Sequence, residues 1–231
     1  MTRHVVVNAD DFGLCDGVNA GVVEAYVRGI VTSTSLMVRA EAVPAAADLA
    51  RRHPQLGVGL HLDLGEWVHG NGGWEPAYTV VDTDDDDAVA AEIDAQLAAF
   101  DALLGRPPTH LDSHQHVHRQ GPARRLLRDA GRRLGIPVRQ VTPGFVYRGE
   151  FYGQSGTGDP YPEGITVDAL VGVIRSVGPG WTEIACHPGR GTAALSYGRE
   201  REQELAVLCD GAVAAAARAA DLTLTPFAPL R

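Results

Sequence analysis

The chain alternates between short apolar runs rich in β-branched residues and longer stretches in which apolar side chains recur at helical spacing. The short runs, bounded by turn residues, predict buried strands. They fall at 5–9, 33–38, 57–62, 109–112, 136–141, 182–186 and 222–225. The longer stretches predict helices, several of which end at Gly or Pro. They fall at 17–29, 42–53, 86–105, 120–134, 166–177 and 199–220.

Regular alternation of strand and helix predicts a parallel sheet. With six or seven such units and no Gly-x-Gly-x-x-Gly after the first strand, a closed or nearly closed barrel is favoured over an open dinucleotide-binding sheet. We therefore predict an α/β fold in a single domain over residues 1–231. Catalytic residues of such barrels lie at the carboxyl ends of the strands, so the polar residues suspected of chemistry should fall there.

Residues 142–164 break the alternation, because Gly, Pro and aromatic residues accumulate there without a clear period. A loop of that length is usually functional or disordered. Three tyrosines and two phenylalanines argue against disorder. We expect a segment that covers the substrate, with a packed surface loop as the alternative.

Composition narrows the class of protein. A chain of 231 residues with 45% hydrophobic and 21% charged residues suits one substantial core. No stretch approaches the roughly 20 apolar residues that cross a bilayer, and the first residues lack a signal-peptide pattern, so we expect a cytoplasmic protein without a membrane partner. Three scattered cysteines favour buried apolar positions over a disulfide framework. The net charge of −9 argues against nucleic acid and favours a neutral or weakly charged substrate.

Two adjacent carboxylates, Asp10 and Asp11, end the first predicted strand. Like charges side by side cost free energy unless a cation or a proton separates their roles, so the pair indicates a working site. The alternative is that one of them caps the following helix. His61 ends the third predicted strand on the same face as Asp63. A metal ligand and a core histidine hydrogen-bonded to Asp63 are the two interpretations of His61.

The strongest cluster is His110-Leu-Asp-Ser-His-Gln-His-Val-His118, with four histidines and an acid in nine residues. If the backbone stays extended, residues two apart face the same side, so His114, His116 and His118 would point together. Imidazole and carboxylate without a thiolate set predict a catalytic metal site, suited to zinc, iron, manganese or nickel, and not a structural zinc site. His187 follows the sixth predicted strand, where it suits a proton donor.

Six segments, in order along the chain, closely resemble the YdjC-like carbohydrate deacetylase family. They are Asn8-Ala-Asp-Asp-Phe-Gly13, Gly29-Ile-Val-Thr-Ser-Thr-Ser35, Gly59-Leu-His61, Pro108-Thr-His-Leu-Asp-Ser-His-Gln-His-Val-His118, Phe151-Tyr-Gly153 and Cys186-His-Pro188. The resemblance implies a distorted TIM-like (β/α) barrel. It also implies one divalent metal ion, Mg²⁺ or Zn²⁺, and hydrolysis of the N-acetyl group of a sugar or short chito-oligosaccharide.

Matched residue by residue, the resemblance implies metal ligation by Asp11, His61 and His114. It further implies that Asp10 is the general base and that His187 is a candidate acid.

The matching segments also supply the substrate contacts that we predict, which are Asp112, His116, Phe151 and Tyr152. Contact of His116 with the metal instead of the substrate stays open, as does a homodimer. Two functions are alternatives to a deacetylase. A metal-dependent phosphoesterase would usually carry a histidine pair on the first strand, where this chain has Asp10 and Asp11. A sugar-binding protein that retains the metal site without turnover would be separated by an activity assay.

Overall fold

A computed structural model describes residues 2–70, 73–193, 195 and 197–230 of the chain. Its main sheet is parallel, with the order β6-β3-β2-β1-β8-β7 and with β9 beside the first residues of β1. The strands are β1 (Arg3–Phe12), β2 (Ser33–Leu36), β3 (Gly57–Leu62), β6 (Leu111–Ser113), β7 (Phe145–Arg148), β8 (Gly180–Cys186) and β9 (Leu222–Leu224). The predicted parallel α/β fold is confirmed.

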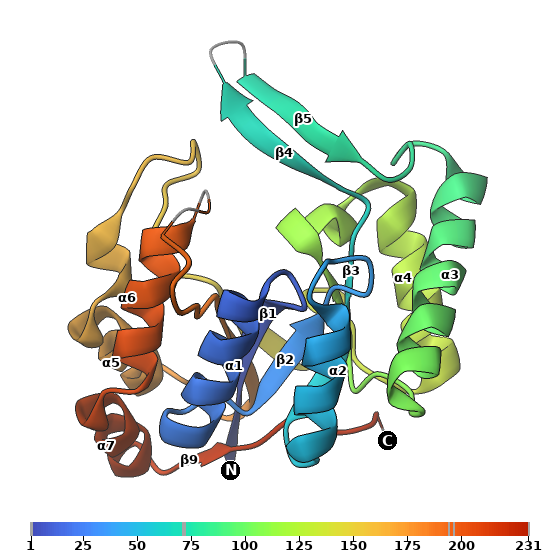
Figure 1. Ribbon diagram of the computed structural model, residues 1–231. Helices are drawn as coiled ribbons and strands as arrows, with labels where there is room; N and C mark the ends of the chain where they lie inside the picture. Colours follow the sequence, from blue (N-terminus) through green and yellow to red (C-terminus); the bar gives the residue numbers. More distant parts are fainter. Residues whose placement is uncertain (1, 71–72, 194, 196, 231) are drawn as a thin grey trace.

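Helices follow the strands in sequence and flank the sheet (Figure 1). They are α1 (Asp16–Arg28), α2 (Val43–Arg52), α3 (Asp86–Leu104), α4 (Gly121–Leu134), α5 (Val167–Arg175), α6 (Gly198–Leu208) and α7 (Gly211–Ala219), with 3₁₀ helices η1 (His114–Arg119) and η2 (Pro162–Ile165). No helix that the structure describes combines the length and the apolar character that crossing a membrane requires.

The sheet separates an apolar layer from a polar interior. On β1, Val5, Val7 and Ala9 join the apolar core together with Val18 and Val22 of α1. The residues that alternate with them on β1 include Asn8 and Asp10, which point to the opposite face. Burial of the first set stabilises the layer of helices on the sheet, and the second set leaves polar groups inside the curl of the sheet.

The sheet curls into a half-barrel. Three strands lie between β6 and β8 in the sheet, yet the Arg139 guanidinium contacts both Asp112 of β6 and Glu183 of β8. The closed or nearly closed barrel that we expected is not completed within the described residues, because no strand pairing joins β7 to β6. Only a single bridge, between Leu111 and Val138, extends the sheet beyond β6.

Three predicted elements differ from the structure. The segment 136–141 is not a strand, because Gln140 adopts a positive φ of 54° and the Val138 carbonyl accepts hydrogen bonds from two residues of a turn. The segment 142–164, expected to be a loop, contains β7. The helix expected at 199–220 is two helices, because Asp210 caps the start of α7 through the Ala212 N–H.

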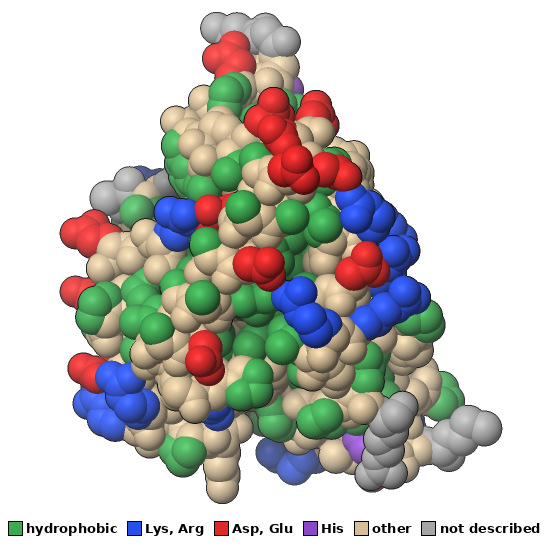
Figure 2. All heavy atoms as spheres, turned by 90° about the vertical axis from the view of Figure 1, so that its right-hand side faces the viewer, with side chains coloured by type: hydrophobic (Ala, Val, Ile, Leu, Met, Phe, Trp, Pro, Cys, Tyr) green, Lys and Arg blue, Asp and Glu red, His purple; other side chains and the backbone are tan. Residues whose placement is uncertain are grey.

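An antiparallel hairpin made of β4 (Gly65–Gly70) and β5 (Gly73–Thr79) was not predicted from the sequence. It follows β3 and projects from the rest of the molecule at the top of Figure 1. The surface of the molecule that carries α3 and α4 is charged, with acidic and basic side chains close together (Figure 2). Arg133 lies 2.9 Å from Asp94 there, and Arg125 pairs with Asp86.

Candidate functional site

The polar residues that we expected at strand ends converge at the carboxyl edge of the sheet. Asp10 and Asp11 lie near the end of β1, His61 near the end of β3, and His187 directly after β8. The register places His61 beside Asp112 of β6. Parallel neighbours bring their carboxyl ends to one edge, which is why residues far apart in the sequence meet here.

Asp11, His61 and His114 form a cradle of three potential metal ligands. Asp11 Oδ1 lies 3.2 Å from His61 Nε2 and 3.2 Å from His114 Nδ1. Asp11 has a positive φ of 66°, and the pairing of β1 with β2 shifts register between Ala9 and Phe12. This local irregularity turns two successive carboxylates towards one site, which a regular strand would point to opposite faces.

The donor set of the cradle fits a divalent metal ion. Ligand atoms about 2.0–2.2 Å from a common ion are themselves separated by about 3.0–3.5 Å, which the two distances of 3.2 Å match. The nitrogen of His61 that does not face Asp11 has a carboxylate partner, because its Nδ1 lies 2.8 Å from Asp112 Oδ1. This contact fixes the orientation of the ring. A carboxylate on the far nitrogen of a ligating histidine is the usual arrangement in metal sites.

A buried cation organises the carboxylates beside the cradle. Arg139 donates to both oxygens of Asp10 at 2.6 and 2.7 Å and to Glu183 at 2.7 Å, and it lies 2.8 Å from Asp112 Oδ2. All four side chains are almost completely buried. Burial alone would raise the pKa of Asp10, but the Arg139 guanidinium outweighs it and lowers this pKa to about 2. Asp10 is therefore a carboxylate at neutral pH.

Asp11 has an arginine of its own. Arg201 of α6 donates from Nη2 to Asp11 Oδ2 at 2.5 Å. Burial raises the pKa of Asp11, but Arg201 and the two cradle histidines hold it well below its usual range. The pair leaves Oδ1 of Asp11 directed at the histidines, so one oxygen meets the cradle and the other meets Arg201.

The four histidines of the 110–118 segment do not point together. Gln115 and His116 have positive φ angles of 48° and 56°, so the chain leaves the extended conformation directly after His114. Only His114 reaches the cradle. His116 Nε2 lies 3.2 Å from the Tyr147 hydroxyl, and His118 bonds Ser113 and the Arg139 carbonyl. The expectation that His114, His116 and His118 share one face is wrong, because it assumed an extended backbone.

His187 lies beside Asp10. Its Nε2 is 3.8 Å from Asp10 Oδ2, and its Nδ1 is 3.7 Å from Glu204 Oε1. The His187 backbone N–H donates to the other Glu204 oxygen at 2.5 Å. The Tyr152 ring packs edge-on against His187, and it also stacks on Tyr197. A carboxylate, a histidine and two stacked tyrosines thus lie next to the cradle.

Two of the predicted substrate contacts do not suit that role. Phe151 is 1% exposed and belongs to the apolar core, so it cannot reach a substrate in this structure. Asp112 is also completely buried, where it binds His61, Ser35 and Arg139. Tyr152 and His116 are partly exposed and keep the predicted role open to test.

Three residues near the site, Arg139, Arg201 and Glu204, were not predicted from the sequence. Arg139 is a lone charge in the apolar segment 136–141, and that was the available signal. Arg201 and Glu204 are three residues apart, which places them on one face of the predicted helix. Neither of these signals could show which residues Arg139, Arg201 and Glu204 contact.

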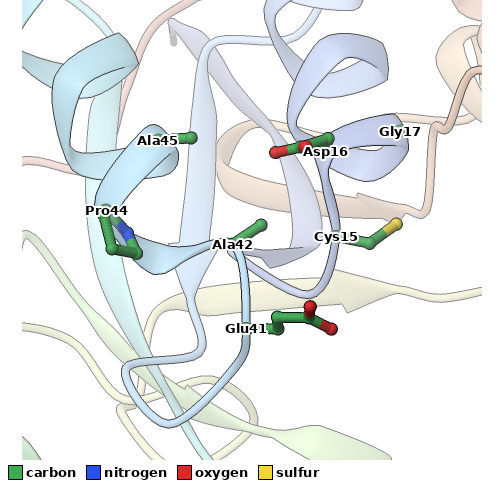
Figure 3. A pocket seen from close by; sticks show the side chains of 7 residues that line it. All are labelled: Cys15, Asp16, Gly17, Glu41, Ala42, Pro44 and Ala45. Atoms are coloured by element: carbon green, nitrogen blue, oxygen red, sulfur yellow. The ribbon is translucent and has the colours of Figure 1, made fainter.

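A separate pocket of about 500 Å³ lies where the loop before α1 meets the start of α2 (Figure 3). Cys15, Asp16 and Glu41 contribute side chains to it. None of the cradle residues, and none of Asp10, Arg139, His187, Arg201 or Glu204, lines this pocket. The candidate chemistry therefore belongs to the strand ends.

Residues 4–219 match the model of the family described as YdjC-like protein. A carbohydrate deacetylase of Geobacillus stearothermophilus is 35% identical over 232 residues, covering 91% of each chain. A chitooligosaccharide deacetylase of Salmonella paratyphi B is 43% identical over 136 residues, and that match spans about half (51%) of each chain.

Two solved structures share the fold. One from Enterococcus faecalis superposes with a TM-score of 0.79 at 24% identity over 98% of each chain. A family 4 carbohydrate esterase from Streptomyces lividans gives a TM-score of 0.58 at 13% identity, covering 95% of this chain and 90% of the other. Both are α/β proteins to which the half-barrel described above is similar.

Proposed function

The chain belongs to the YdjC-like family, and from that premise we propose that it is a metal-dependent hydrolase that removes the N-acetyl group of an acetamido sugar or short chito-oligosaccharide and releases acetate. The observation that carries the proposal is the cradle of Asp11, His61 and His114 next to Asp10 and His187. The relatives named as deacetylases support the substrate class.

Asp11, His61 and His114 would hold a divalent ion, which would supply the Lewis acidity needed to lower the pKa of water and to polarise an amide carbonyl. The two imidazoles of the cradle favour zinc or another transition metal over magnesium, which prefers oxygen ligands. Neutral imidazole is the ligand form. Burial lowers the pKa of His61 and His114, but their carboxylate neighbours raise it to about 10 and about 9, so metal binding should release protons.

Asp10 is the general base in this proposal. Arg139 keeps it ionised and holds both its oxygens, which fixes its orientation towards the side of the cradle. His187 gives a proton to the departing amine, and Glu204 orients its backbone and lies near its Nδ1. Tyr152 and His116 remain the proposed substrate contacts. A cytoplasmic location, a single domain over residues 1–231 and a homodimer stay predictions from the sequence.

The test is acetate release from N,N′-diacetylchitobiose by metal-stripped protein, repeated after zinc, magnesium, manganese or cobalt is restored. We expect release only with metal, and loss of release together with loss of metal in His114→Ala. His53→Ala, at the end of α2, is the matched control and should behave as wild type. No release from this or other acetylated sugars with any metal would overturn the proposal and favour the sugar-binding alternative, whereas phosphate release from phosphoesters would favour the phosphoesterase.

A further inference from the structure

The hairpin of β4 and β5 starts four residues after His61 and projects at the top of the molecule in Figure 1. An isolated two-stranded hairpin is marginally stable in water, so the contacts that hold its base decide where it lies. Most of its residues are exposed, among them Val68 and Trp74 at 45% and 56%. Its base is the part that meets the site.

Two anchors fix the base of the hairpin. The Gln115 amide accepts from the Trp67 N–H and donates to the Trp67 carbonyl, both at 2.8 Å. On the other strand, the Tyr78 hydroxyl lies 3.1 Å from each oxygen of Asp63. Gln115 directly follows His114 and has a positive φ of 48°, a conformation that costs on the order of 1 kcal/mol or more for a residue with a side chain. The contacts with Trp67 help to offset that cost and couple β4 to the cradle.

This coupling brings Glu66 to the outer side of His114. Glu66 Oε2 lies 3.9 Å from His114 Nε2, and the Glu66 side chain is 31% exposed. His114 Nε2 is buried and has no hydrogen-bond partner among the described residues. The other cradle histidine differs on this point, because the far nitrogen of His61 has a carboxylate partner, Asp112, at 2.8 Å.

We propose that Glu66 is the positioning carboxylate of His114, as Asp112 is for His61. His114 Nδ1 faces Asp11, so its Nε2–H is the donor that needs a partner if Nδ1 is to carry the lone pair for a metal ion. A separation of 3.9 Å exceeds a hydrogen bond, and a side-chain movement of about 1 Å brings it to about 2.9 Å. The hairpin thus supplies the hydrogen-bond acceptor that the outer nitrogen of His114 lacks. This inference rests on the metal site of the proposed function.

The test measures zinc affinity of the full chain by competition with a chromophoric chelator, for wild type, Glu66→Ala, Glu66→Gln and Glu75→Gln. We expect Glu66→Ala to weaken zinc binding by about 10- to 100-fold, the usual effect of removing such a partner. Glu66→Gln keeps an acceptor without the charge and should lie between Glu66→Ala and wild type. Glu75→Gln is the matched control, since Glu75 is on the same hairpin opposite Val68, and it should match wild type.

Two results would overturn the inference. If Glu66→Ala binds zinc as wild type does and only its KM for the sugar rises, Glu66 contacts the substrate and does not position His114. If Glu75→Gln weakens zinc binding as much as Glu66→Ala does, the effect is a general property of the hairpin. Wild-type protein that binds no zinc, or binds it equally with His114→Ala, would instead count against the proposed function itself. Thermal unfolding of each metal-free variant confirms that the fold is retained.

Discussion

The pKa of a histidine is shifted in opposite directions on the Asp11 side and on the Arg139 side of the site. His114 faces the Asp11 carboxylate, which outweighs the effect of burial and raises the pKa of His114 to about 9. His110 and His118 lie on the Arg139 side, where burial lowers the pKa of each to about 4 and the nearby guanidinium acts in the same direction. These histidines belong to one segment of nine residues. Burial lowers the pKa of all three rings, and contacts with carboxylates outweigh burial at His114 but not at His110 or His118.

The two parts also differ in what their buried polar groups meet. Arg139 pairs with three buried carboxylates through short contacts, and two of these, Asp10 and Asp112, accept further hydrogen bonds from Asn8 and Ser35. The cradle is built around Asp11, and His114 keeps a nitrogen without a partner among the described residues. A buried cation bonded to several carboxylates suits a fixed support, whereas three potential ligand atoms gathered at one point suit the binding of a metal ion. The comparison therefore assigns support to the Arg139 side and ligand binding to the Asp11 side.

Replacement of Arg139 should break this comparison most severely. Arg139→Leu leaves Asp10, Asp112 and Glu183 buried without their cation, so we expect the free energy of unfolding to fall by about 3–5 kcal/mol in urea titrations. Arg133→Leu is the control, because Arg133 is 61% exposed and its ion pair is with the exposed Asp94, and it should stay within about 0.5 kcal/mol of wild type. Equal stability of the two variants would show that the network is not a support.

A smaller effect is expected from Asp10, which lies between the two parts. Asp10→Asn removes the general base and leaves the cradle, so the acetate release rate should fall roughly 100-fold or more while zinc affinity is unchanged. Steady-state kinetics and chelator competition measure the two quantities. Asp16→Asn, in the first turn of α1, is the control. If Asp10→Asn retained full activity, another group would have to be the base.

The smallest effect concerns the pH dependence of stability. His110 has a pKa of about 4 in the folded protein against 6.5 in the unfolded chain, so its contribution is fully present above pH 6.5 and is lost as the pH falls towards 4. Between about pH 7.5 and about pH 5.5, wild type should lose about 1 kcal/mol more unfolding free energy than His110→Asn.

Urea titrations at the two pH values measure this difference, and the partly exposed residue His53 gives the control, His53→Asn. An identical pH dependence in wild type and His110→Asn would mean that His110 is not held neutral. That result would remove the contrast between the two sides of the site.

Several features were predictable because they depend on local pattern. The β-branched run at 5–9 lies within β1, and the placement of Asp10, Asp11 and His187 at strand ends follows from the rule for parallel barrels. The hairpin at 65–79 was missed because a short strand that projects into solvent lacks a buried face, and its apolar residues show no pattern tied to the core. The strand expected at 136–141 failed for a related reason, since its apolar side chains are buried around a turn.

By itself the sequence determined the class of fold, the strands that carry the acids, and the three residues Asp11, His61 and His114 that meet in the cradle. Periodicity and strand-end position are properties of neighbouring residues, and they indicated the fold class and these strands. The ligand set of Asp11, His61 and His114 followed instead from the resemblance to the YdjC-like family. Only the tertiary structure decided that Arg139 joins three carboxylates, that Arg201 reaches Asp11, and that His116 and His118 turn away. Those outcomes depend on charges from distant segments meeting in a buried interior, where partners set each ionisation state, and no local pattern specifies them.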